Sequence, residues 1–437
     1  MNIDSFIILI INALAYTVLF LKYEFKKKSI DIGSIILLTW IIGSWGSVYY
    51  YTFESAYLSY DKITILPLVY LFCMNLLLFI PFLKIDFIQL KSIELYNLRK
   101  VFNVLSCFFA VISIAPLIDC CSKLASFSFI GAALADMYES DEDKSKLIFS
   151  PMIKPLFSIM RHFTVFIYFL FFYQLTRKKY NILIIIGLGS GILTFLLFSL
   201  LCGSRGGIVS TLLACAYFFL FMKNMMRPKL IKCMTYFAYL IVGCLILGIS
   251  AISFSRLSNM NDQSGRELLM DHWISQYAGE GIIRFDTTIW NLDAHLNGTQ
   301  TLPYLYSYVN PDVKDVETYA PKAEYTIKTP VTVFYTYIGD IMIDFGIIGT
   351  IIVVLIMHLV IRFLSEVKKG KISFYHVILL SFFYQCLTIG FTANLYRGYF
   401  NQKTIVENLS LLLILFIFQN LYKKYYAPSV GYRNTSL

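Results

Sequence analysis

The sequence predicts an all-α polytopic membrane protein with about eleven transmembrane helices. The chain has 437 residues, of which 58% are hydrophobic and only 15% are charged, and its mean hydropathy is +0.67. Soluble domains average about 45–50% apolar and about 25% charged residues, so the excess of apolar side chains must face lipid. The apolar runs reach about 20 residues, too long for barrel strands, so the spans must be helices. This composition excludes a soluble enzyme and a disordered chain, and it predicts one integral membrane domain over residues 1–437.

Hydropathy windows of about 19 residues locate the candidate spans. In chain order they are 3–21, 34–52, 63–83, 101–119, 156–176, 182–202, 208–222, 233–252, 346–365, 372–393 and 405–421. The segment 208–222 is short, and the mildly apolar segment 330–345 is open to interpretation as a re-entrant or interfacial piece. The expected architecture is therefore a single helical bundle rather than a series of soluble domains.

The basic residues predict which end of this bundle faces the cytoplasm. Lysines and arginines cluster after every second span and in the C-terminal tail, within residues 22–28, 84–100, 177–179, 223–232, 362–371 and 423–433. Short loops rich in these residues stay in the cytoplasm, which puts the N-terminus outside and the C-terminus inside. Anionic lipid beside these clusters accounts for the net charge of +10, so no nucleic-acid partner is expected.

Two connections on the predicted outer face are long, namely 120–155 and 253–345. The second is expected to contain two helices separated by Gly279 and Gly281, the later one beginning near Ile282. Because long loops with helices of their own are usually functional, this extracytoplasmic loop is the expected place for the chemistry.

Arginines on the predicted outer face suggest a pyrophosphate site. Arg205 lies in the turn GSRGG at 203–207, where small residues let a ligand approach the backbone, and its guanidinium suits phosphate oxygens. Further arginines belong to the outer loop or to outer helix ends: Arg161, Arg266, Arg284 and Arg397. Simple lipid anchoring would place such cations on the cytoplasmic side, so their position favours a pyrophosphate.

Other kinds of chemistry find little support in the sequence. Few ionisable groups lie in the middle of the spans, which argues against an ion-coupled transporter. The nine cysteines show no CxxC or Cys/His metal spacing, so no metal site and no cofactor are expected. Walker, HExxH and nucleophile-elbow motifs are likewise missing from the sequence.

Three motifs together resemble a known family. They are SRGG at 204–207, QYAGEGIIRFD at 276–286 and TPVTVFYTYIGDIMIDFGIIGT at 329–350, the last leading into a span. Their order and placement are similar to those of bacterial oligosaccharide repeat-unit polymerases, the Wzy-type O-antigen and capsule polymerases, which are related in architecture to O-antigen ligases. The resemblance covers most of the chain in topology, and in motif only these stretches and the outer loop around them.

The resemblance implies a GT-C-like, metal-independent glycosyltransferase in the bacterial cytoplasmic membrane, with an active site that faces the periplasm or exterior. Such an enzyme transfers the growing glycan from undecaprenyl pyrophosphate to the non-reducing end of another lipid-linked repeat unit, and a chain-length regulator is a possible protein partner. By motif the resemblance implies roles for Arg205 and Arg284, whereas Arg266 and Arg397 match the family by position only. The residues expected in catalysis are Arg205, Arg284, His272 and Asp286. The residues expected to bind the pyrophosphate or the glycan are Arg205, Arg266, Arg284, Arg397, Arg161, Tyr335 and Asp340.

The sequence leaves the identity of the general base and of the acceptor undecided. Carboxylates and a histidine of the outer loop are the candidates for the base: His272, Glu280, Asp286, Asp340 and Asp344. Asp340 and Asp344 are four residues apart, so a helix would put both on one face. An O-antigen ligase would use a different acceptor, and a lipid-linked oligosaccharide flippase would show related halves and short outer loops.

Overall fold

The computed structural model describes residues 2–27, 30–54, 62–87, 89–126, 148–236 and 276–426, together with residues 145, 238, 239 and 243. Within these ranges the fold is a bundle of long apolar helices, and many large apolar side chains lie on its outside. Eight of the described helices are long and apolar enough to cross a membrane: α1 (Ile3–Lys27), α2 (Ile32–Glu54), α3 (Ile65–Leu83), α4 (Arg99–Ser126), α9 (Ile182–Leu201), α10 (Arg205–Met222), α15 (Tyr337–Leu364) and α17 (Tyr399–Tyr426). The prediction of an all-α polytopic membrane protein is confirmed at this level.

Two predicted spans differ from straight membrane helices. The span expected at 156–176 is a pair, α7 (Lys154–His162) and α8 (Thr164–Thr176), with a bend of 76° between them. Arg161 and His162 end α7 at this bend, because charged groups are costly inside hydrocarbon and a bend lets them lie outside it. The span expected at 372–393 contains α16 (Phe374–Ile389), which is shorter than a usual spanning helix.

The span predicted at 346–365 begins earlier than hydropathy indicates. In α15 the helical residues start at Tyr337, and Gly346 interrupts them with φ 65° and ψ −174°. The first part of α15, including Asp340 and Asp344, is buried against the rest of the bundle. The hydropathy windows miss this part because its two carboxylates lower the mean hydropathy of the segment. The segment is nevertheless helical, with both carboxylates buried inside the protein.

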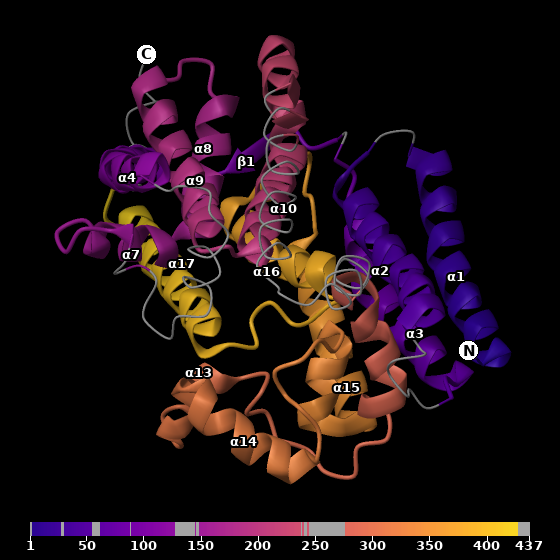
Figure 1. Ribbon diagram of the computed structural model, residues 1–437. Coiled ribbons are helices and arrows are strands. Elements are labelled where there is room, and N and C mark those ends of the chain that lie inside the picture. Colours follow the sequence, from indigo (N-terminus) through magenta and orange to yellow (C-terminus); the bar gives the residue numbers. More distant parts are fainter. Residues whose placement is uncertain are drawn as a thin grey trace, which may run out of the picture.

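The long outer loop contains several short helices, as expected. After residues 276–284, which are α-helical, come the π-helix η2 (Phe285–Ile289), α13 (Pro303–Tyr306), the 3₁₀-helix η3 (Pro311–Lys314) and α14 (Val316–Ile327). Figure 1 shows α13 and α14 together at one end of the bundle. Most of the predicted span 233–252, most of the loop 120–155 and residues 253–275 lie outside the described residues, although α4 extends to Ser126 and residues 228–236 are helical.

The expected helix break at Gly279 and Gly281 is wrong, because residues 276–284 form one continuous helix. A Cβ on Gly279 would lie 2.4 Å from the carbonyl carbon of Gly46 in α2, and a Cβ on Gly281 would lie 2.6 Å from the carbonyl oxygen of Phe391. Gly279 therefore allows close backbone contact with α2, and Gly281 allows close contact with the turn after α16, so neither glycine reverses the chain.

A short parallel sheet closes the end of the bundle away from α13 and α14. Strand β1 (Ser92–Glu94) pairs with β2 (Lys371–Ser373), with Ser92 opposite Lys371. Since α15 ends before β2 and α16 follows it, these two helices connect the sheet to the end of the bundle that carries the outer loop.

Candidate functional site

Three segments that are distant in sequence meet at the end of the bundle that carries α13 and α14. They are helix 276–289, the segment 330–345 and the loop 390–398 between α16 and α17. The ring of Tyr277 packs against that of Phe334 at a centroid distance of 4.7 Å. The backbone N–H of Tyr337 donates to the carbonyl oxygen of Gly390 at 2.6 Å. Together with the contact of Gly281 on Phe391, these interactions hold the three segments as one unit.

Helix 276–289 presents Arg284, oriented by Glu280. The Arg284 Nε and Nη2 atoms each lie 2.6 Å from Oε1 of Glu280, one helical turn earlier. The Glu280 side chain is 2% exposed, whereas that of Arg284 is 21% exposed. A buried carboxylate thus holds a guanidinium that a ligand can still reach.

The loop 390–398 presents Arg397 in a similar way. Its Nη1 donates to the carbonyl oxygen of Val333 at 2.9 Å and lies 3.4 Å from Oδ1 of Asp340. The other carboxylate oxygen of Asp340 accepts the backbone N–H of Asn394 at 2.6 Å. Asp340 is fully buried and the Arg397 side chain is 22% exposed, so this pair repeats the arrangement of Glu280 and Arg284.

Tyr335 follows Val333, whose carbonyl oxygen accepts from Arg397, by two residues. Its ring is buried, and its hydroxyl donates to the carbonyl oxygen of Pro330 at 2.6 Å. Burial raises the pKa of Tyr335 to about 12, while the positive fields of Arg284 and Arg397 act in the opposite direction. The phenol is therefore neutral at physiological pH.

Arg205 begins α10, and its three guanidinium nitrogens are buried. Tyr217, late in α10, donates its hydroxyl to the carbonyl oxygen of Val377 in the first turn of α16 at 2.8 Å, as expected for antiparallel helices. Arg205 lies twelve residues before Tyr217 in α10, and Ile389 lies twelve residues after Val377 in α16. Both are therefore about 18 Å along their helices from this contact. Arg205 therefore lies at the level from which the loop carrying Arg397 emerges.

Two other predicted site residues, Asp286 and Arg161, make contacts of a different kind. Asp286 is buried and accepts hydrogen bonds from the backbone N–H and the hydroxyl of Thr64 at 2.5 and 3.0 Å, just before α3. Burial raises the pKa of Asp286, and the bonds from Thr64 partly oppose this. Arg161 is exposed at the bend between α7 and α8, beside His162, which pairs with Glu407 of α17. The structure gives Asp286 a role in holding α3 and places Arg161 with a separate cluster.

Of the other predicted residues, two lie outside the described part of the chain and one has a structural contact. Arg266 and His272 lie outside the described residues. Asp344 is on the same buried stretch as Asp340, as the spacing of four predicts, but it accepts backbone N–H groups of Gln300 and Thr301 and so fastens the turn after helix 276–289. Among the described residues there is no group of three or more His, Cys, Asp or Glu side chains able to hold a metal ion.

Sequence reasoning missed the part that Glu280 and Asn394 play in orienting the arginines. The spacing of Glu280 and Arg284 by four residues is a recognisable helical ion-pair signal. The expected break at Gly279 and Gly281 concealed it, because the signal applies only if the helix continues through both glycines. No local signal points to Asn394, whose backbone meets Asp340 only in the folded chain.

The fold and the site define a polytopic α-helical membrane protein with two arginine–carboxylate pairs at one end of its bundle. No family model, no curated protein and no solved structure matches the chain.

Proposed function

We propose that this chain is a membrane glycosyltransferase that polymerises lipid-linked oligosaccharide repeat units. It would move the growing glycan from undecaprenyl pyrophosphate to the non-reducing end of another undecaprenyl-pyrophosphate-linked unit. The observation that carries the proposal is the pair of partly exposed guanidinium groups, Arg284 and Arg397, each oriented by a buried carboxylate.

This arrangement suits a pyrophosphate that becomes a leaving group. A guanidinium has five N–H donors in a rigid plane, more than one carboxylate can accept, and it binds two phosphate oxygens in parallel. The buried partners of Arg284 and Arg397 fix the direction of each plane before substrate arrives, so little reorganisation is needed during the reaction. Arg205, at the same level of the bundle, is the third cation that we assign to this site.

In the proposed reaction a hydroxyl oxygen of the acceptor sugar forms a bond to the anomeric carbon of the donor glycan. The bond from that carbon to the pyrophosphate oxygen breaks, and its electron pair leaves with undecaprenyl pyrophosphate. The hydroxyl proton passes to water. As in glycoside hydrolysis, positive charge develops on the sugar ring, while negative charge accumulates on the pyrophosphate beside the arginines. Donors that meet this charge lower the barrier, and loss of one such donor typically costs about 10²–10³ in rate.

The orientation that we propose puts this site on the outer face of the bacterial cytoplasmic membrane. The N-terminus would be outside, the C-terminus would be cytoplasmic, and about eleven helices would span the bilayer. In support, the lysine-rich segments 84–100 and 362–371 lie at the β1–β2 end, opposite the site. A polysaccharide chain-length regulator is the protein partner that this function would involve.

The proposal is tested with the purified full-length protein in detergent and undecaprenyl-pyrophosphate-linked repeat units, without nucleotide sugar or metal. A ladder of glycans on a gel, lost in Arg284→Gln and Arg397→Gln but kept in Lys322→Gln, supports the polymerase. Lys322 is a suitable control because it is an exposed cation of the same end of the bundle and pairs with Asp312 at the surface.

Two other results contradict the proposal. If the glycan is transferred only when lipid A core is supplied, the protein is a ligase. If lipid-linked units cross a vesicle membrane and no glycosidic bond forms, it is a flippase.

A further inference from the structure

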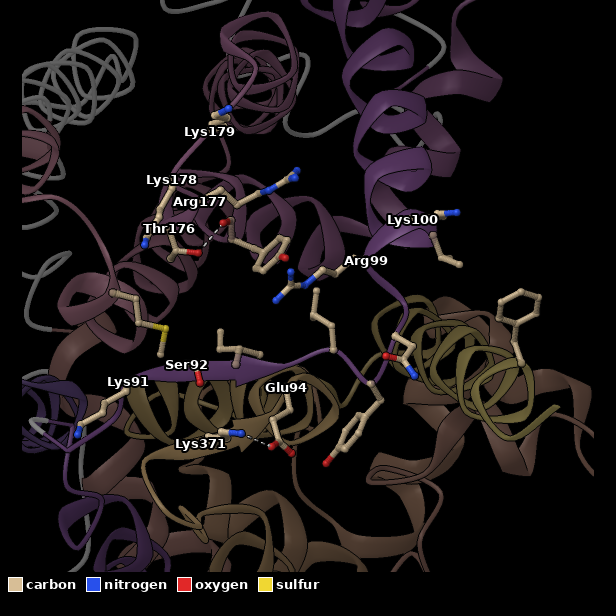
Figure 2. Close-up of a pocket in the computed structure, with 18 residues that line it drawn as sticks. Lys91, Ser92, Glu94, Arg99, Lys100, Thr176, Arg177, Lys178, Lys179 and Lys371 are labelled. Carbon is tan, nitrogen blue, oxygen red and sulfur yellow. Dashed lines mark hydrogen bonds and ion pairs between the residues drawn. The ribbon is translucent and has the colours of Figure 1, made fainter. Parts of the chain in front are cut away.

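At the end of the bundle opposite the candidate site, the structure contains a large basic cavity of about 1470 Å³. It is enclosed by the start of α4, the end of α8 and the two short strands (Figure 2). Of the described residues that line it, seven are cationic and one is a carboxylate: Lys91, Arg99, Lys100, Arg177, Lys178, Lys179, Lys371 and Glu94. Glu94 lies 3.5 Å from Lys371, so one of these cations already has an acidic partner within the lining.

The ends of several elements bring this charge together. Arg99 is the first residue of α4, and Figure 2 shows its guanidinium directed into the space between β1 and the end of α8. Arg177 follows α8, and its Nη1 donates to Asn103 at 2.6 Å and to Gln174 at 3.1 Å, which fixes its position. The N-terminus of α4, a helix of 28 residues, adds its own partial positive charge at the same place.

A second, apolar hollow lies further along α4 from this cavity. Val101 lines the basic cavity, and the hollow begins one turn later, at Asn103 and Val104. It has a volume of about 500 Å³ and reaches Ile112. From Val104 to Ile112 the helix rises about 12 Å. Val104, Phe108 and Val111, which line the hollow, are exposed on the side of α4 that faces away from the bundle, and Val104 is 67% exposed.

We infer that the basic cavity binds an anionic phospholipid, with the headgroup phosphate among the cations and an acyl chain in the hollow along α4. Basic pockets between membrane helices bind acidic headgroups because several fixed cations meet one phosphate near the bilayer surface. A soluble phosphate would satisfy the cations equally well but would leave the hollow empty. Because the apolar hollow begins one turn along α4 from the cations, within reach of an acyl chain attached to the phosphate, a lipid is favoured as the source of the phosphate.

The test titrates the delipidated full-length protein with phosphatidylglycerol, phosphatidylcholine and inorganic phosphate, and counts the bound molecules by native mass spectrometry. The cavity variant is Lys91→Gln/Lys178→Gln/Lys179→Gln, because these three lysines line the cavity and are exposed. The matched control is Lys22→Gln/Lys26→Gln/Lys229→Gln, which removes the same charge from exposed positions that do not line it.

We expect phosphatidylglycerol to bind the wild type and the control more tightly than phosphatidylcholine does. Each cavity lysine removed should weaken phosphatidylglycerol binding about fivefold, so the triple variant should bind it about 100-fold more weakly. Equal losses in the cavity variant and the control would mean general surface attraction and would overturn the inference. Inorganic phosphate binding as tightly as phosphatidylglycerol would also overturn it, since the hollow would then contribute nothing.

Discussion

The Glu280–Arg284 pair yields a quantitative prediction. In Glu280→Gln the side chain keeps its size and one acceptor oxygen but loses its charge. A hydrogen bond to a charged partner contributes about 1.5–3 kcal/mol, against about 0.5–1.5 kcal/mol for a neutral one. The Arg284 guanidinium makes two such contacts with one buried oxygen, so its preferred orientation should weaken by about 1.4 kcal/mol, or about tenfold in rate.

A double-mutant cycle on Glu280 and Arg284 should show that their effects on the rate do not add. Arg284→Gln removes the guanidinium itself and should cost about 10²–10³ in the rate of polymerisation. Because Glu280 acts only through Arg284, the double variant should be no slower than Arg284→Gln alone, rather than a further tenfold slower. The assay is the initial rate of ladder formation by purified protein, with the melting temperature of each variant measured beside it.

Two results would refute this account. If Glu280→Gln keeps the wild-type rate, the buried carboxylate does not orient the arginine during the reaction. If the losses multiply in the double variant, Glu280 has a role of its own, for example as the base that accepts the acceptor proton.

Three further predictions concern stability and are measured by thermal unfolding in detergent. Gly279→Ala should destabilise the protein by about 1–3 kcal/mol, because its Cβ would meet backbone at 2.4 Å. The control Gly206→Ala, whose Cβ would have nothing within 4 Å, should be neutral or stabilising, and equal effects of the two variants would contradict the packing argument. Burial raises the pKa of Tyr335 to about 12, so the contribution of the neutral phenol to the free energy of unfolding is complete below about pH 10 and is lost toward pH 12. The free energy of unfolding should therefore fall by up to about 1.4 kcal/mol per pH unit in this range, and Tyr335→Phe should flatten that fall. Asp286→Ala should cost about 1–3 kcal/mol through the lost bonds to Thr64, and an unchanged melting temperature would argue against its structural role.

The class of the fold was predictable because helices that face lipid need continuous runs of apolar residues, which can be read from the sequence. Runs of apolar residues locate α1, α3 and α9 to within a few residues, since each helix must cover its own backbone polar groups in hydrocarbon. Small residues in α9 allow close helix packing, because a Cβ on Gly187 would lie 2.6 Å from that of Ala110. The bend at Phe163 was not predicted, since hydropathy averages over both halves of the pair.

The sequence by itself determined that this is a helical membrane protein with arginines concentrated outside its apolar runs. It also identified Arg284 and Arg397 as residues of interest, because they belong to the predicted outer loop or to an outer helix end, where simple lipid anchoring does not account for them. Only the tertiary structure decided which carboxylate each arginine meets. Asp340 and Arg397 are 57 residues apart, and they pair because α15 and the loop after α16 pack together. Hydropathy is a property of neighbours along the chain, whereas the electrostatics of this site depend on distances that exist only after the helices have packed.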